Sequence, residues 1–488
     1  MTATSSRMFR HTRARPGGVS SRWDAALILI SVLSLFLPHG LLIPMWAVIA
    51  FLIAGWLWAS QADAGTRQVM SATVLLCLVG LIPVNLLGLT APDVLIFALA
   101  VGILTFSMTR FRQVALPVGT FGVVALCTVW FCTTAINAEL VQVLVRSATV
   151  LLPLAAVFVA AGQMHMSVRT RVVNFFIIFA SFQAVVAIIE SELGPEAPWR
   201  TNNNYRGLDM TSPLLPTLQR VEGTFGHPLI LSLVLLVAMG FLASRFGWLP
   251  LALRGPLGML LLAGVVLSGT RSAAAMGLVL MLLIVVSESS TPRYLLVTSG
   301  VLVASPFIFE SSYMQQVVGR LTTSGSVSHR LESWDAFGKL IFEQPFMQVL
   351  LGNGLDSTAR LFDEGLLQSS TFTVIDNQIV TALAHGGIVA ILLLVGLMLV
   401  AILRADLRDL PAVVIIASQF FLFDLSTWPA TTVLMALALA WGLNPRTEIG
   451  GANTWSRRLT PAAIQDADRG WGPTSRHDSL KKDKWEVD

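Results

Sequence analysis

One arginine of this chain lies where a positive charge is costly. Arg271 follows Ser268-Gly269-Thr270 in a short turn between two apolar runs, and 17 residues separate it from Arg254. That separation is roughly 25 Å of helix, against about 30 Å of hydrocarbon in a bilayer. The guanidinium should therefore lie at or just beneath one headgroup layer, where lipid phosphates and diphosphates are the available anions. Arg271 is a candidate diphosphate ligand, and snorkelling to ordinary headgroups is the alternative.

A second arginine, Arg330, precedes a short amphipathic segment. Leu331, Trp334 and Phe337 recur at helical spacing, which predicts a helix along the membrane surface with Trp334 as an interfacial anchor. Arg330 is predicted to open this helix, where free backbone N–H groups also attract anions. Arg330 and the helix start could together hold a phosphate. The alternative is an arginine in a solvated loop.

Asp376 and Asn377 come directly before the apolar run of residues 379–402. The Asp376 carboxylate could act as a general base toward a hydroxyl, pair with one of the two arginines, or cap the following helix. His385 lies nine residues after Asp376, about 13 Å along the same predicted helix. For His385, packing is the favoured role.

Glu222 and His227 flank a glycine-containing stretch that leads into another apolar run. Gly permits a close backbone approach and Pro suits a first helical position, so residues 222–228 are predicted to form a tight turn. Either titratable side chain could touch a substrate hydroxyl. Three other charged residues near span ends are expected to snorkel: Arg146, Glu190 and Asp424.

The elements that position these residues must be membrane helices. Hydrophobic residues make up 55% of the 488 residues and charged residues only 12%, whereas a soluble domain is roughly a quarter charged. The composition predicts an all-α integral membrane protein with about 12–14 transmembrane helices. It excludes a cytosolic enzyme, a disulfide-stapled secreted domain and a disordered scaffold. The three cysteines have neither metal nor disulfide spacing.

The apolar segments and the basic loops predict a topology. Segments lie near 24–37, 41–60, 69–88, 91–108, 114–132, 140–161, 172–190, 228–244, 255–268, 273–287, 294–309, 378–402, 411–425 and 430–443. The positive-inside rule places the arginine-rich residues 1–23 in the cytoplasm. The transmembrane domain is then residues 24–444, with extracytoplasmic loops 191–227 and 310–377. Residues 445–488 read as a disordered cytoplasmic tail.

Four motifs in chain order resemble the O-antigen ligase and polymerase superfamily of bacterial polytopic membrane glycosyltransferases. The resemblance covers roughly residues 220–400. The matching stretches are Gly223-Thr224-Phe225-Gly226-His227-Pro228; Ser268-Gly269-Thr270-Arg271-Ser272; Arg330-Leu331-Glu332-Ser333-Trp334 with Pro345 and Gly352-Asn353-Gly354; and Asp376-Asn377-Gln378 with Gly386-Gly387.

The resemblance implies a fold and a chemistry. The fold would be GT-C-like, with short helices in the large outer loop. A glycan would pass from an undecaprenyl diphosphate donor to an acceptor sugar hydroxyl, on the outer face of the bacterial plasma membrane, without metal or cofactor. Arg271 and Arg330 would bind the diphosphate and stabilise the leaving group. Other expected partners are the acceptor glycan, the lipid bilayer and proteins of polysaccharide assembly, and no nucleic acid.

One departure from the family pattern affects the mechanism. The resembled ligases carry His before the Asn, where this chain has Asp376. The sequence therefore leaves three candidates for the general base, which are Asp376, Glu222 and His385. The departure also favours a polymerase of lipid-linked repeat units over a ligase. The expected catalytic residues are Arg271, Arg330 and Asp376. The expected substrate-binding residues are Glu222, His227, Trp334, Asn377 and His385.

Two alternative functions, each from a different class of protein, stay open. A transporter or flippase for lipid-linked saccharides would need a charged path through the membrane, whereas the polar residues gather near the predicted outer face. An assembly component without chemistry would hold Arg271, Arg330 and Asp376 far apart or in structural pairs.

Overall fold

The computed structural model describes residues 19–37, 39–82, 91–109, 116–200, 212, 214, 218–244, 251–288, 325–367 and 375–445. Within these ranges every regular element is a helix, which confirms the predicted all-α class. Contacts divide the chain into two units, Met1–Pro445 and Arg446–Asp488. The second unit, residues 1–18 and the span predicted near 294–309 lie outside the described residues.

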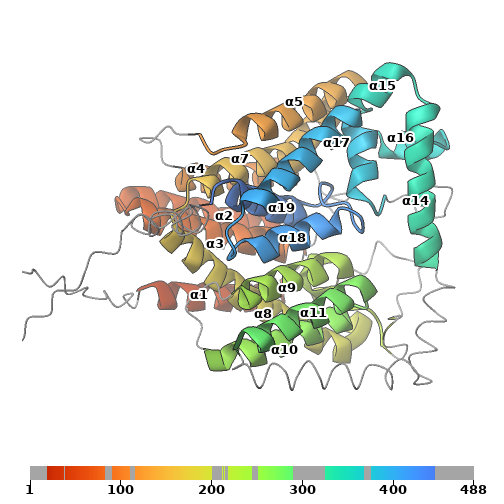
Figure 1. Ribbon diagram of the computed structural model, residues 1–488. Helices are drawn as coiled ribbons and strands as arrows, with labels where there is room; N and C mark the ends of the chain where they lie inside the picture. The colour runs from red at the N-terminus through yellow and green to blue at the C-terminus, as the bar shows by residue number, and fades with distance from the viewer. Residues whose placement is uncertain are drawn as a thin grey trace, which may run out of the picture. The chain divides into compact units, whose positions relative to one another are not determined.

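Figure 1 shows how the helices of the bundle are arranged. They are α1 (Val19–Ser34), α2 (His39–Ala59), α3 (Ala64–Leu81), α4 (Ala91–Met108), α5 (Thr120–Asn137), α6 (Leu140–Arg146), α7 (Leu152–Gly162), α8 (Met166–Leu193), α9 (Pro228–Ala243), α10 (Leu251–Leu267), α11 (Arg271–Glu288), α17 (Gln378–Arg404), α18 (Leu410–Gln419) and α19 (Pro429–Leu443). A five-residue π-helical stretch, Ser147–Leu151, joins α6 to α7.

Six of the described helical segments are long and apolar enough to cross a membrane. They are Leu41–Ala59, Ala64–Leu81, Thr120–Asn137, Leu140–Gly162, Met166–Glu196 and Gln378–Arg404. Six further apolar helices are shorter, among them α9, α18 and α19. Length and composition therefore support an integral membrane protein.

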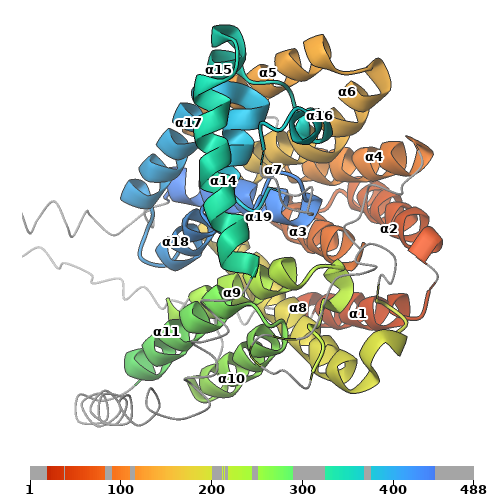
Figure 2. The same ribbon diagram turned by 90° about the vertical axis from the view of Figure 1, so that its right-hand side faces the viewer.

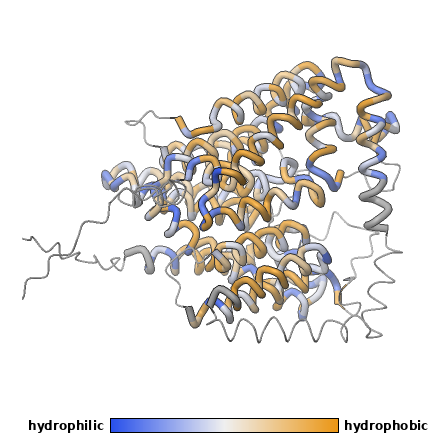
Figure 3. The backbone as a smooth tube through the Cα atoms, viewed as in Figure 1, coloured by the Kyte–Doolittle hydropathy of each residue, from blue (hydrophilic) through white to orange (hydrophobic). Residues whose placement is uncertain are grey.

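Figure 3 shows hydrophobic residues along most of the bundle helices, and these residues include both buried and exposed ones. Helices α9 and α19 bury nearly all of their residues. Helix α2 buries Trp46 completely but leaves Leu52 67% exposed, and α5 leaves Phe121 82% exposed. Helices that are apolar on all sides are stable when neighbouring helices cover one face and lipid covers the other. The exposed apolar surface is thus what a membrane-embedded bundle requires.

The ends of the bundle are tied by different interactions. At one end, called the hairpin end, the Val221 N–H donates to the Leu267 carbonyl and the Gln378 N–H donates to the Phe420 carbonyl. These bonds join the turn before α9, the α10–α11 hairpin, the start of α17 and the α18–α19 connection. At the opposite end Arg169, at the start of α8, pairs with Asp409, which precedes α18. The helices alternate in direction between the two ends, as the predicted spans do.

Three short helices form a separate layer with its own hydrophobic cluster. They are α14 (Gly325–Phe342), α15 (Phe346–Leu351) and α16 (Thr358–Asp363). Leu340 of α14 and Leu361 of α16 pack with Leu383 of α17 in this cluster. Figures 1 and 2 show α14 running across the direction of the bundle helices.

The predicted start of the surface helix is wrong. Helix α14 begins at Gly325 rather than at Arg330, because the intervening Ser326, Val327 and Ser328 continue the helical backbone. Arg330 therefore lies in the second turn, where backbone N–H groups are used within the helix. A phosphate site built on a helix start at Arg330 is excluded by this geometry.

Helix α17 bends sharply at Gly387, which has a φ of 65° inside the helix. Gly352, with a φ of 81°, packs against the backbone of residues 385–387. The bend follows His385, so His385 still lies on the uninterrupted helical stretch that begins at Gln378, as predicted, whereas the predicted span of residues 378–402 is not one straight helix. Residues 378–386 form a short separate helical segment, and His385 lies beside the bend.

We expect the Gly387→Ala variant to have a lower melting temperature in detergent. A backbone with φ 65° and ψ −165° is essentially restricted to glycine and costs another residue about 1–3 kcal/mol, and the added Cβ would overlap the Leu350 carbonyl group. Gly396→Ala in the same helix is the control, because a Cβ there meets nothing within 4 Å and Ala favours a helix over Gly. Equal melting temperatures for the two variants would contradict the bend.

Candidate functional site

Two arginines that are distant in sequence meet at the α10–α11 turn. Arg220 donates from Nε to the Ser268 carbonyl at 3.0 Å and from Nη2 to the Thr270 hydroxyl at 3.4 Å. Gly269 makes the turn possible with a φ of 69°. Arg271 follows at once as the first residue of α11 and is partly exposed. The Arg220 guanidinium therefore contacts the turn that Arg271 directly follows, and the term cationic turn is used for Arg220 with Ser268–Arg271.

Sequence reasoning missed Arg220. The sequence feature that could have indicated Arg220 is its position two residues before Glu222, at the start of the glycine-containing stretch. An arginine in a long polar loop is usually solvated, so its type alone predicts no contact. The partnership with the Ser268–Thr270 turn exists only because the Val221 N–H reaches the Leu267 carbonyl.

Glu190 holds the backbone that carries Arg220. Its carboxylate is 1% exposed at the end of α8, and it accepts from the backbone N–H groups of Glu222 at 2.9 Å and Gly223 at 2.8 Å. The Trp199 indole N–H donates to the same carboxylate at 3.2 Å. The prediction that Glu190 snorkels is wrong, because buried N–H groups of a non-helical turn need an acceptor.

Glu222 and His227 lie in this turn as predicted, but both are enclosed more than the sequence suggested. Glu222 is 2% exposed. His227 is half-buried, and its Nδ1 accepts the Leu229 N–H at 3.2 Å, which caps α9. Burial and the nearby Arg220 guanidinium lower the pKa of His227 to about 3. His227 is therefore neutral at physiological pH, and its ring contacts Trp428 with centroids 5.2 Å apart.

Three consecutive residues at the start of α17, namely Asp376, Asn377 and Gln378, have different roles. Asn377 is the helix cap, since its Oδ1 accepts from Ile379 N–H at 2.9 Å and Val380 N–H at 3.3 Å. The alternative that Asp376 caps the helix is therefore wrong, and Asp376 is partly exposed just before the cap. Gln378 accepts the Leu425 N–H at 2.7 Å. The two residues that directly follow Asp376 are thus both held by hydrogen bonds.

Asp424 organises the α18–α19 connection rather than snorkelling, so that prediction is also wrong. Its buried carboxylate accepts from the Ser426 N–H and hydroxyl, each at 2.9 Å, and from the Thr427 N–H and hydroxyl. Burial raises the pKa of Asp424, and these hydrogen bonds oppose the rise. The loop ends in Trp428, which stacks on Phe423 with centroids 6.1 Å apart.

His385 belongs to a second group of residues. Its Nε2 lies 2.9 Å from the Thr358 hydroxyl, and its carbonyl accepts from the Gly354 N–H and the Thr133 hydroxyl. These partners come from α5 and from the segment around α16, rather than from the cationic turn. Its burial, 4% exposed, agrees with the packing role favoured from the sequence.

An ion pair secures the loop beside His385. Arg146 pairs with Asp356 at 3.0 Å, so the prediction that Arg146 snorkels alone is wrong. The bond ties the end of α6 to the chain just before α16. The loop is therefore held from α5, α6 and α17 together.

The remaining predicted site residues lie on α14. Trp334 is 44% exposed, with its ring centroid 5.9 Å from that of Phe337. The backbone of Arg330 lies in α14, but its side chain lies outside the described part of the chain. The pairing of Arg271 with Arg330 on one diphosphate therefore stays a prediction.

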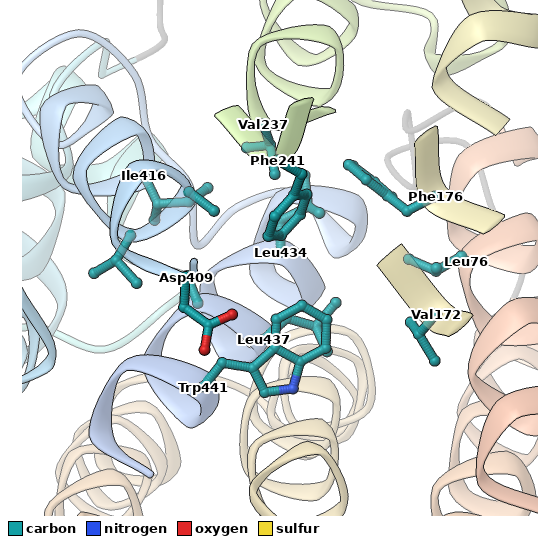
Figure 4. Close-up of a pocket in the computed structure, with 13 residues that line it drawn as sticks. Leu76, Val172, Phe176, Val237, Phe241, Asp409, Ile416, Leu434, Leu437 and Trp441 are labelled. Atoms are coloured by element: carbon teal, nitrogen blue, oxygen red, sulfur yellow. The ribbon is translucent and has the colours of Figure 1, made fainter. Parts of the chain in front are cut away.

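A second candidate region is an apolar cavity at the opposite end (Figure 4). Apolar side chains such as Phe176, Phe241 and Trp441 surround it, and Asp409 is its only acidic lining residue. Burial raises the pKa of Asp409 to about 6, while Arg169 at 3.3 Å lowers it. Both members of this pair are at most 1% exposed, and the pair joins the start of α8 to the residue before α18.

No protein-family model matches this chain, and no curated protein matches it. Among the described residues, no group of three or more His, Cys, Asp or Glu side chains could hold a metal ion. The cationic turn, Asp376 and the aromatic rings beside them are therefore the basis for a functional proposal.

We expect Glu190→Gln to lower the melting temperature of the purified protein. Each carboxylate oxygen accepts a backbone N–H, so an amide NH2 must face one of these donors, which costs about 1–3 kcal/mol. Glu192→Gln on the same helix is the matched control, because Glu192 is exposed. A loss of stability in both variants, or in neither, would remove Glu190 as the support of the turn.

Proposed function

We propose that this protein is a membrane glycosyltransferase that polymerises lipid-linked oligosaccharide repeat units for a surface polysaccharide. The donor is an undecaprenyl diphosphate oligosaccharide and the acceptor is a sugar hydroxyl of a second lipid-linked glycan. The hairpin end faces the outside of a bacterial plasma membrane, both chain termini lie in the cytoplasm, and the fold is of the GT-C type. The proposal combines the motif resemblance with the residues gathered at the hairpin end.

The observation that carries the proposal is the meeting of Arg220 and Arg271 at one turn. Arg220 is hydrogen bonded to Ser268 and Thr270, directly before Arg271. A diphosphate offers several acceptor oxygens to guanidinium groups, and the turn combines the Arg220 guanidinium with the position of Arg271 at the start of α11. The turn lies where apolar helices end, which suits a headgroup whose isoprenoid chain stays in the bilayer.

The proposed reaction assigns each group one task. The acceptor hydroxyl oxygen attacks the anomeric carbon of the donor sugar, and its proton passes to the Asp376 carboxylate. The bond between the anomeric carbon and the diphosphate oxygen breaks, and the lipid diphosphate leaves with the electron pair. Arg220 and Arg271 stabilise the charge that develops on that oxygen.

Among the three candidate bases, the geometry favours Asp376. Glu222 is buried in the turn and His385 is buried beside Thr358. Asp376 is partly exposed, and the residue that caps α17 is Asn377 rather than Asp376. A carboxylate at the edge of the hairpin end can receive a proton from a hydroxyl that approaches from water.

The assay is extension of an undecaprenyl diphosphate oligosaccharide by purified protein. Arg220→Ala and Arg271→Ala should each reduce turnover by about 10²–10³, the loss typical of removing one electrostatic donor. Arg404→Ala, which alters an exposed arginine at the opposite end, should retain turnover. Full activity in both site variants would remove the diphosphate role.

The same assay tests the metal requirement. We expect extension to continue after treatment with EDTA, since the proposed stabilisation of the leaving group comes from guanidinium groups. Activity lost to the chelator and restored by a divalent cation would contradict the metal-independent mechanism.

We expect Asp376→Asn to lower turnover by about 10²–10⁴, the usual contribution of a general base, with no change in melting temperature. The helix cap is Asn377, so Asn377→Ala should instead lose about 1 kcal/mol of stability. Unchanged turnover in Asp376→Asn would assign the base elsewhere.

The glycan made by cells without this gene distinguishes a polymerase from the alternative, a ligase. Single repeat units on the lipid carrier are expected if the protein polymerises. Long chains that stay on the carrier would instead indicate a ligase that delivers glycan to a lipid or protein acceptor. Unchanged glycan would contradict both.

A further inference from the structure

An aromatic cluster stands beside the cationic turn. The His227 ring lies 5.2 Å from the Trp428 ring and 5.6 Å from the Phe423 ring, measured between centroids. Phe423 and Trp428 stack with an interplanar angle of 17°. Phe423 is buried, whereas Trp428 remains partly exposed. Phe423 therefore supports one face of an indole that is still accessible from the hairpin end.

The cluster and the cationic turn belong to one neighbourhood. The charge of Arg220 acts on His227, and His227 touches Trp428. Gln378, two residues after Asp376, bonds the Leu425 and Ser426 N–H groups of the loop that carries Trp428. The indole therefore lies at the hairpin end, together with the cationic turn and the start of α17.

The loop before Trp428 has little freedom to move. Besides the Asp424 and Gln378 bonds, the Thr431 hydroxyl donates to the Leu425 carbonyl at 2.6 Å and the Thr432 hydroxyl donates to the Ser426 carbonyl at 3.2 Å. A loop with this many internal bonds presents its last side chain in one position. Such preorganisation lowers the entropic cost of binding a ligand.

We propose that Trp428, supported by Phe423 and His227, is a stacking platform for the sugar ring attached to the donor diphosphate. This inference rests on the proposed function. The C–H groups on one face of a pyranose are weakly positive, and the face of an indole is negative. On the proposed function, a sugar bonded to a diphosphate at Arg220 and Arg271 lies at the hairpin end, and the Trp428 indole is at the same end.

The competing role for Trp428 is an anchor at the membrane surface, as in aromatic belts. An anchor needs no bonded loop and no aromatic support. An anchor also makes no distinction between a lipid diphosphate with a sugar and one without. Binding measurements with these two lipids therefore separate the two roles.

The experiment measures the affinity of protein in nanodiscs for two probes. One is undecaprenyl diphosphate, and the other is the same lipid carrying one N-acetylglucosamine. In Trp428→Leu, which keeps an apolar side chain without an aromatic face, the sugar-bearing probe should bind about tenfold more weakly. Binding of the bare lipid diphosphate should change less than twofold. Trp428→Phe should keep most of the affinity for the sugar.

Two controls make the result decisive. Trp58→Ala alters a tryptophan that is 49% exposed near the end of α2, far along the helix from the hairpin end, and should change neither affinity. Melting temperatures of the Leu and Phe variants verify folding, and the comparison between these two variants isolates the aromatic face.

The outcomes separate the platform from the proposed function. If Trp428→Leu weakens the binding of both probes equally, or of neither probe, Trp428 is not a stacking platform for the sugar. If wild-type protein binds neither lipid, or if Arg271→Ala leaves binding of the bare lipid unchanged, the proposed function itself fails.

Discussion

Buried backbone N–H groups that lie outside helices must find acceptors, and this constraint organises the hairpin end. In an apolar bundle no water is available to them, and an unmet donor costs more than a hydrogen bond contributes. Glu190 at the end of α8, Asn377 and Gln378 at the start of α17, and Asp424 in the α18–α19 connection supply the acceptors. These four side chains make irregular backbone possible at the place where the candidate site lies.

The positions of the candidate site residues follow from those acceptors. Glu190 places the turn that carries Arg220, and Arg220 in turn contacts the residues before Arg271. Asp424 and Gln378 hold the loop that ends in Trp428. The cationic turn and the aromatic cluster are thus supported by buried polar groups rather than by the apolar core. This arrangement resembles second-layer support of catalytic groups in general, where rigid neighbours hold a site in its working geometry.

Glycines give the structure its two sharpest departures from straight helices. Gly387 bends α17, and Gly269 closes the turn before Arg271, each with a positive φ. At Gly387 a side chain would also collide with the Leu350 carbonyl group. The bend turns the first part of α17 into part of the smaller cluster with α14 and α16. The large polar loop of the sequence is therefore a packed layer where it is described.

The sequence by itself determined the class of the protein, because hydrophobic composition and the length of apolar runs decide which solvent a helix tolerates. It also identified the turn at Arg271 and the positions of Glu222, His227, Asp376 and Asn377 near helix starts, since Gly, Pro and charged residues mark such boundaries. Only the tertiary structure decided that Arg220 reaches the Ser268–Thr270 turn, that Glu190 and Asp424 are buried acceptors, that Asn377 caps α17, and that Trp428 stands beside His227. These features depend on contacts between residues far apart in the chain, and local patterns of residue type carry no information about which distant backbone donor a side chain will meet.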